Sequence, residues 1–189
     1  MVRDTAMNNV PSLIIIGGFP GSGKTTISSK LSYELGVPRL SSDAIGHTIK
    51  DSVDVIESRV DAFRVAYDIL FALCGQFVVN RASVVLDLTL GWEFHWKELD
   101  KIVNQNPQVL FLPIILHCSY EQCMDRIDER HKTTSKYEAP DFYTTEQKVL
   151  DMWGYLQNLK RPEVSYVDAN KDEDQVYKAV WQCVMSRIG

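Results

Sequence analysis

The residues best suited to chemistry stand together near the N-terminus, in the run Gly18-Phe19-Pro20-Gly21-Ser22-Gly23-Lys24-Thr25. This run fits the pattern G-x-x-x-x-G-K-[ST]. Glycines let backbone N–H groups approach phosphate oxygens with no Cβ in the way. A lysine at this position reaches the β- and γ-phosphates, and the following hydroxyl is a hard oxygen ligand for magnesium. The pattern predicts a nucleoside triphosphate site made by Gly18, Gly21, Ser22, Gly23, Lys24, Thr25 and Thr26.

The flanking sequence has the form that such a loop needs. Residues 13–16 are a short apolar run, three of them β-branched, which predicts a strand buried on both faces. After the glycines, Ile27, Leu31 and Leu35 recur at helical spacing. That helix would begin near Lys24 and direct its positive dipole end at the same anion. A glycine-rich turn that matched the pattern by accident would lack this strand and helix.

Two further acidic residues stand where short apolar runs end. Asp43 follows an expected strand over 37–41, and Asp87 closes an expected strand over 83–87. Open α/β sheets bind ligands at the carboxyl ends of their strands, so both acids are candidate site residues. Each also has a structural interpretation. Asp43 would cap a short helix starting at Ala44, and Asp87 would be an ordinary strand-end turn residue.

Strand and helix patterns alternate along the rest of the chain. Helices are expected over 53–74, 92–104, 119–130, 145–159 and 174–188, with strands over 109–117, interrupted by Pro113, and 164–167. Residues 131–143 lose the periodicity and predict a loop or flap. This alternation requires right-handed crossovers and a parallel sheet. We therefore expect a three-layer α/β P-loop fold, like that of nucleoside kinases, with five parallel strands and helices on both faces.

Length and composition limit the interpretation further. The 189 residues predict one domain over 12–189 preceded by a flexible arm over 1–11. The net charge of −5 disfavours an extended nucleic-acid surface. The four cysteines lack metal-binding spacing and are expected to be reduced. With no signal-peptide core and no apolar run approaching the roughly 20 residues of a membrane span, we expect a cytoplasmic protein, either monomer or dimer.

Several classes of protein share the phosphate loop, and other positions separate them. A GTPase would carry D-x-x-G after the third strand, but Gly91 comes one position too late after Asp87. The run Asn170-Lys171-Asp172-Glu173 approaches the guanine-reading N-K-x-D but ends in Glu. Guanine recognition therefore stays open as the weaker alternative. A motor ATPase usually has a longer chain with an oligomerisation module, so a small kinase fits best.

Five segments in order carry a more specific resemblance: residues 18–26, Ser41-Ser42-Asp43, residues 84–87, Arg126 with Arg130, and residues 166–169. Together they resemble the P-loop kinases that include polynucleotide 5′-kinases, zeta-toxin-like sugar-nucleotide kinases, chloramphenicol phosphotransferase and gluconate-kinase-like enzymes. The resemblance implies ATP, Mg²⁺ and phosphoryl transfer to a hydroxyl. It also implies that Asp43 accepts the proton of that hydroxyl, and that Thr25 and Asp87 hold the metal, Asp87 through water.

The same resemblance makes Arg126 and Arg130 catalytic residues beside the flap, with Lys132 and Lys136 assisting. Their structural alternative is a solvated helix face paired with nearby acids. One departure concerns the acceptor. Many of these kinases have an arginine shortly after the strand-end acid, where this chain has Ile45-Gly46-His47. A nucleic-acid end or another strongly anionic acceptor is therefore not expected, and an aromatic cluster at Trp92, Phe94, His95 and Trp96 would suit a small flat or partly apolar acceptor. A 5′-hydroxyl polynucleotide kinase and a catalytically silent nucleotide sensor stay open as alternatives.

Overall fold

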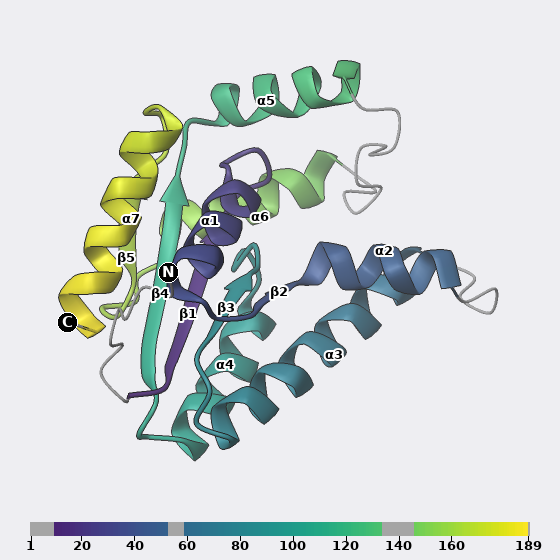
Figure 1. The fold of residues 1–189 in the computed structure, drawn as a ribbon. Helices are drawn as coiled ribbons and strands as arrows, with labels where there is room; N and C mark the ends of the chain where they lie inside the picture. The colour runs from purple at the N-terminus through teal and green to yellow at the C-terminus, as the bar shows by residue number, and fades with distance from the viewer. Residues whose placement is uncertain (1–9, 53–58, 134–145, 189) are drawn as a thin grey trace.

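The fold was analysed in a computed structural model that describes residues 10–52, 59–133 and 146–188. Strands and helices alternate along the chain (Figure 1). The strands are β1 (Ser12–Gly18), β2 (Arg39–Ser41), β3 (Val84–Asp87), β4 (Leu110–His117) and β5 (Ser165–Asp168). The helices are α1 (Lys24–Leu35), α2 (Ser42–Ser52), α3 (Arg59–Val79), α4 (Glu93–Gln105), α5 (Tyr120–Thr133), α6 (Glu146–Asn158) and α7 (Glu173–Ile188).

The five strands form one parallel sheet in the order β2-β3-β1-β4-β5. The strand order changes direction at β1, so the crevice at the switch point opens where β1 ends. The phosphate loop leaves β1 at that end. The predicted fold class is confirmed, and it explains why one loop can dominate the site.

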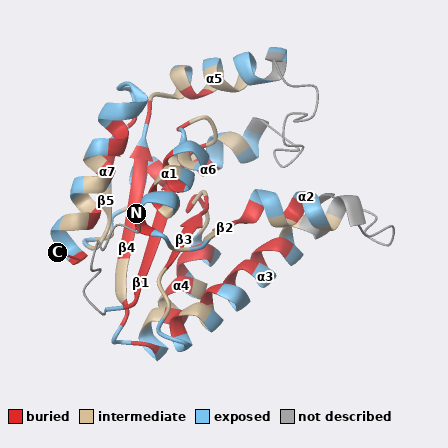
Figure 2. Cartoon of the chain, viewed as in Figure 1, coloured by how far each residue is buried: buried red, intermediate tan, exposed pale blue. Residues whose placement is uncertain are grey.

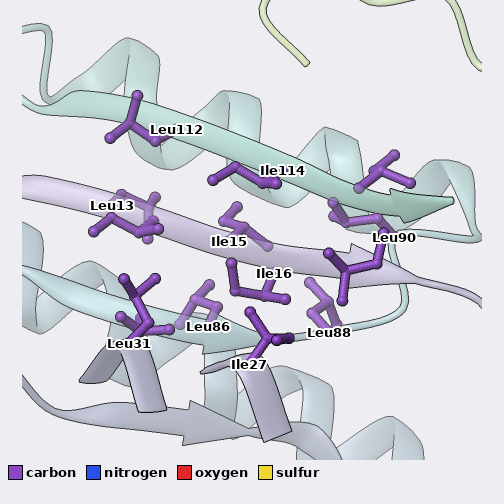
Figure 3. Close-up of a cluster of buried hydrophobic side chains, with 14 of the residues drawn as sticks. Leu13, Ile15, Ile16, Ile27, Leu31, Leu86, Leu88, Leu90, Leu112 and Ile114 are labelled. Atoms are coloured by element: carbon purple, nitrogen blue, oxygen red, sulfur yellow. The ribbon is translucent and has the colours of Figure 1, made fainter. Parts of the chain in front are cut away.

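Helices cover both faces of the sheet (Figure 1). α1 and α7 pack together on one face, and α3 and α4 pack together on the other. All seven residues of β1 are buried, as expected for a central strand (Figure 2). Figure 3 shows Ile27 and Leu31 of α1 directed at the apolar side chains of β1 and β3. The helix that carries Lys24 is therefore fixed to the sheet by its apolar face.

The segment after β2 differs from expectation. α2 begins at Ser42, directly after the strand, so Asp43 lies inside the first helical turn. The Ala44 N–H donates to the Ser41 hydroxyl at 3.4 Å, so Ser41 takes the capping position. The interpretation of Asp43 as the cap of a helix starting at Ala44 is wrong. The next helix, α3, extends five residues beyond the expected end at Cys74 to Val79, and residues 53–58 lie outside the described part.

Two other expected boundaries, in β4 and α5, differ from those in the structure. Pro113 does not interrupt β4, which continues to His117. Pairing of β4 with β5 starts only at Ile114, so no β5 residue is paired opposite the proline that lacks an N–H. Of the expected flap over 131–143, the first three residues belong to α5, and the rest lies outside the described residues. The expected arm lies mostly outside them as well, and the chain joins the sheet at Pro11, whose carbonyl accepts from Leu110 N–H at 2.9 Å.

The cysteines and helices agree with two simpler expectations. All four cysteines are free thiols, and Cys74, Cys118 and Cys123 are buried. Among the helices that the structure describes, none combines the length and apolar character needed to cross a membrane.

We expect the packing of α1 to carry a measurable share of stability. Leu31 is 0% exposed, so Leu31→Ala should lower the free energy of unfolding by about 2–5 kcal/mol through lost burial and the cavity left behind. Tyr33, on the same helix and 87% exposed, supplies the control. Tyr33→Ala should change stability by no more than about 0.5 kcal/mol. Urea denaturation measures both, and equal effects would contradict this account of how α1 is anchored.

Candidate functional site

The loop between β1 and α1 depends on glycine at three positions. Gly18, Gly21 and Gly23 have φ values of +141°, +81° and +92°, which L side chains rarely adopt. A Cβ on Gly18 would lie 2.7 Å from the Leu116 carbonyl oxygen. A Cβ on Gly21 would collide with the backbone carbonyl of Cys123 in α5. At Gly18 and Gly21 the backbone therefore lies too close to neighbouring atoms for a residue with a Cβ.

The loop leaves polar groups ready for an anion. Gly23 is the N-cap of α1 and supplies no side-chain hydrogen bond to its first-turn N–H groups. The Ser22 hydroxyl is buried and has no hydrogen-bond partner among the described residues. A helix N-terminus with unpaired donors and a positive dipole end favours phosphate. The residues of the predicted loop therefore fit the polyphosphate of a nucleotide.

Lys24 begins α1 and is partly buried beside this loop. Its Nζ donates to the Phe19 carbonyl at 3.1 Å. Burial lowers the pKa of Lys24, and the charges of Asp87 and Asp43 act in the opposite direction. Arg130 lowers the same pKa further by repulsion. A polyphosphate would supply the negative charge that this lysine lacks.

Asp43 approaches the same loop from the first turn of α2, which directly follows β2. Desolvation raises the pKa of Asp43, although the residue as a whole is exposed. The Lys24 ammonium lowers this pKa, Asp87 raises it, and His47 and Arg130 lower it. Lys24, Asp43, Asp87 and Arg130 therefore form one electrostatically coupled group. The structure brings together four of the predicted site residues from four different elements.

Asp87 has partners that sequence reasoning did not identify. It is 5% exposed, and its Oδ2 accepts from Arg39 Nη1 at 2.7 Å. The Ser28 hydroxyl lies 3.3 Å from the same oxygen and 3.4 Å from Arg39 Nη1. Arg39 stands on the edge strand and Ser28 on α1, each far from Asp87 in sequence. The one hint in the sequence was a charged residue, Arg39, within the expected strand over 37–41.

The two arginines of α5 are placed differently. Arg126 donates to the Gly21 carbonyl at 3.4 Å and to the Ala169 carbonyl at 3.1 Å, so it joins the phosphate loop to the turn after β5. Arg130, one turn further along α5, acts electrostatically on Lys24 and Asp43. An open hollow is lined by Arg126, Glu129, Arg130 and Lys132. Lys136 lies outside the described residues.

Aromatic and uncharged side chains adjoin Asp43. Burial raises the pKa of Tyr67, and the nearby charge of Asp43 raises it further. The Tyr67 hydroxyl lies beside Ser42 and Thr89, and the Thr89 hydroxyl is buried without a hydrogen-bond partner in the described structure. The ring of Phe94 packs edge-on against that of Tyr67, with 5.3 Å between the ring centroids. Phe94 is 44% exposed.

The rest of the predicted aromatic cluster belongs largely to the core. His95 is fully buried against Tyr67, and burial lowers its pKa to about 3, so the ring is neutral. Trp96 is 2% exposed and donates its indole N–H to the Leu90 carbonyl at 3.2 Å. Phe94, 44% exposed, is therefore the member of this cluster that offers an open face beside Tyr67.

A magnesium ion would find few protein ligands here. Among the described residues, no group of three or more His, Cys, Asp or Glu side chains is arranged to hold a metal. Thr25 is exposed at the start of α1, and Asp87 stands at the end of β3. Mg²⁺ is commonly bound by one or two protein oxygens together with phosphates and water. Thr25 and Asp87 fit that kind of site.

Comparison with known proteins agrees with this geometry. A family model described as an AAA domain matches residues 13–152, well over half of the chain. The chain belongs to this AAA domain family. No curated protein sequence matches it.

Solved structures similar to this AAA domain share its fold at low identity. A Chloroflexus aurantiacus protein provisionally described as a kinase has 20% identity and a TM-score of 0.74, over 95% of this chain and 100% of its own. A Sinorhizobium meliloti gluconokinase has 16% identity and a TM-score of 0.59, over 95% and 94%. Chaetomium thermophilum Kti12 in complex with ADP-AlF3 has 16% identity and a TM-score of 0.63, over 94% and 99%. The fold is that of P-loop kinases.

We expect Lys24→Met to remove polyphosphate binding from this AAA domain while leaving it folded. The wild-type lysine is desolvated and lacks a full complement of negative charge, so ATP should raise the melting temperature clearly. In Lys24→Met the ATP-induced rise should be absent. Lys30→Met, on the same helix but paired with exposed Asp174, is the matched control and should keep the rise. An undiminished ATP shift in Lys24→Met would contradict the assignment of the loop.

The raised pKa of Asp43 predicts a pH-dependent stability difference. The folded state holds this proton more tightly than the unfolded state, so the favourable contribution is complete below the unfolded pKa of about 3.9. It is lost as pH rises through the raised folded pKa of Asp43. Asp43→Asn cannot ionise and should melt higher than wild type above that folded value. Thermal melts of both proteins across pH 3 to 8 would test this, and a difference independent of pH would contradict it.

Proposed function

We propose that this chain is an ATP-dependent phosphotransferase that moves the γ-phosphate to a hydroxyl of a small molecule. The observation that carries the proposal is the phosphate loop between β1 and α1, with three glycines at positive φ and Lys24 at the start of the helix. The charge of Asp43 acts on Lys24, which supports Asp43 as the group that accepts the proton. The proposal is supported also by the kinase-like fold and by the resemblance to polynucleotide-kinase-like and zeta-toxin-like enzymes.

Each residue has a role in this proposal. Asp43 orients the acceptor hydroxyl and takes its proton as the oxygen attacks the γ-phosphorus. Lys24, the loop amides and Arg130 stabilise the charge on the transferring group. Thr25 and Asp87 would hold Mg²⁺, which supplies charge neutralisation across the β- and γ-phosphates. Arg126 fixes the loop carbonyl at Gly21, so its contribution is chiefly to the shape of the nucleotide site. Positioning and electrostatics carry the rate.

The acceptor side suits a molecule with an apolar face. Tyr67 lies near Asp43, with its hydroxyl beside Ser42 and Thr89, and His47 also acts electrostatically on Asp43. The open ring of Phe94 beside Tyr67 suits contact with the carbon–hydrogen face of an alcohol or with a flat ring. The gluconokinase among the similar structures is consistent with a small hydroxylated acceptor.

The discriminating experiment is a screen of small alcohols, sugars and nucleosides for acceptor-dependent ADP release. A nucleotide sensor of the same fold would bind ATP and release no ADP with any acceptor. A 5′-hydroxyl polynucleotide kinase would respond to oligonucleotides, with strongly salt-dependent binding. A guanine-specific protein would show GTP displacing labelled ATP better than ATP itself. Any of these three outcomes would replace the proposed function.

Once an acceptor is known, Asp43→Asn should lower kcat by about 10²–10⁴, the usual contribution of a positioned base. The amide keeps the shape of the side chain, so ATP affinity should be unchanged within about twofold. Asp174→Asn, on α7 and with Asp174 90% exposed, is the control and should turn over like wild type. Rapid-quench measurement of phosphoryl transfer separates chemistry from product release. Wild-type turnover by Asp43→Asn would remove Asp43 from the catalytic group.

A further inference from the structure

The ion pair of Arg39 with Asp87, at the edge of the sheet, involves only one of the two carboxylate oxygens. Both hydrogen bonds to Asp87 from described residues, those of Arg39 and Ser28, fall on one oxygen, Oδ2. No described residue donates a hydrogen bond to Oδ1. The carboxylate is therefore held from one side, by a strand and a helix at once.

The surroundings of this ion pair connect it to the phosphate loop. Ser28 lies on the first turns of α1 and its hydroxyl is also 3.2 Å from the Thr25 carbonyl. Asp87 acts electrostatically on Lys24 and on Asp43. The register of β2 with β3 pairs Ser41 with Asp87, so the strand that carries Arg39 leads directly to Asp43. Arg39 thus contacts Asp87 directly and is linked to the start of α1 through Ser28.

We propose that Arg39 is a positioning residue for the magnesium site: it binds Oδ2 of Asp87 so that Oδ1 faces the phosphate loop and the water shell of the metal. This inference rests on the proposed function. Residues that orient a metal ligand without touching the metal commonly change metal affinity or activity by 10–100-fold when they are removed. Without Arg39, the nearly buried Asp87 would keep only the Ser28 hydroxyl as a partner and could rotate. Its rotation would weaken the metal site without altering the loop that binds phosphate.

The test is a magnesium titration of nucleotide binding, which needs no acceptor. Binding of a fluorescent ATP analogue is followed at increasing free Mg²⁺ for wild type and Arg39→Met. We expect Arg39→Met to need about 10-fold more Mg²⁺ for half-maximal binding. Affinity for the analogue in EDTA should stay within about twofold, because the loop and Lys24 are unchanged. Titration curves that superimpose would overturn the proposal.

A matched arginine separates positioning from general stability. Arg161 is 26% exposed and binds Asp100, whereas Arg39 is 24% exposed and binds Asp87. Arg161→Met therefore replaces an arginine of similar burial and removes its ion pairs with Asp100 and Glu163, whose side chains are more exposed than that of Asp87. It should lower the melting temperature and leave the magnesium titration unchanged. A shift equal to that of Arg39→Met would show a general loss of stability and overturn the proposal.

A double mutant shows whether Arg39 acts through Asp87. In the Asp87→Asn background, Arg39→Met should cause no further magnesium shift, because the group it positions is already altered. An additive shift would overturn the proposal. If Arg39→Met does not fold, Arg39→Lys and Ser28→Ala replace it, each expected to shift the titration in the same direction by a smaller factor. Wild-type titrations in both would overturn the proposal. If wild-type binding itself does not depend on Mg²⁺, there is no magnesium site for Arg39 to support and the proposal is overturned; the proposed function fails separately, when no acceptor causes ADP release.

Discussion

The desolvated ammonium of Lys24 is the interaction on which the rest of this structure depends. Burial lowers its pKa, and the charges of Asp87, at the end of β3, and Asp43, in the first turn of α2, oppose that effect. A cation in this state favours the arrival of negative charge more strongly than an exposed lysine would. The sheet order supports it, because β1 stands between β3 and β4 and directs the loop at the switch point. The fold thus places the positive charge of Lys24 at the end of the central strand β1.

Two carboxylates near one lysine need different environments if they are to act differently. Asp87 has Arg39 and Ser28 on one oxygen and lies within the core. Asp43 lies in the first turn of α2, partly open to solvent, with its pKa raised by desolvation. The first suits a fixed structural anion beside a metal, and the second suits a group that takes up a proton. Position in the fold, rather than residue type, separates their roles.

Much of this was predictable because it depends on local pattern. The glycine spacing, the buried β1 and the helical period of α1 each follow from a few consecutive residues, and together they fix the phosphate loop. The partnership of Arg39 with Asp87 spans 48 positions and is a packing outcome that spacing does not encode. The start of α2 was missed because the Ser41 hydroxyl competed with Asp43 as the cap. An interruption of the strand at Pro113 was expected, but a proline is accepted there because the pairing of β4 with β5 begins only at Ile114.

The strand β2 is three residues long and lies at the edge of the sheet, paired with β3 alone. Asp43 and the helix α2 follow from it, whereas the phosphate loop follows from the central strand. The same short strand carries Arg39, which binds Asp87 of the neighbouring strand, so the edge also contributes to the surroundings of the phosphate loop. Changes in α2 beyond its first turn, by contrast, would leave the central strands and their loop in place.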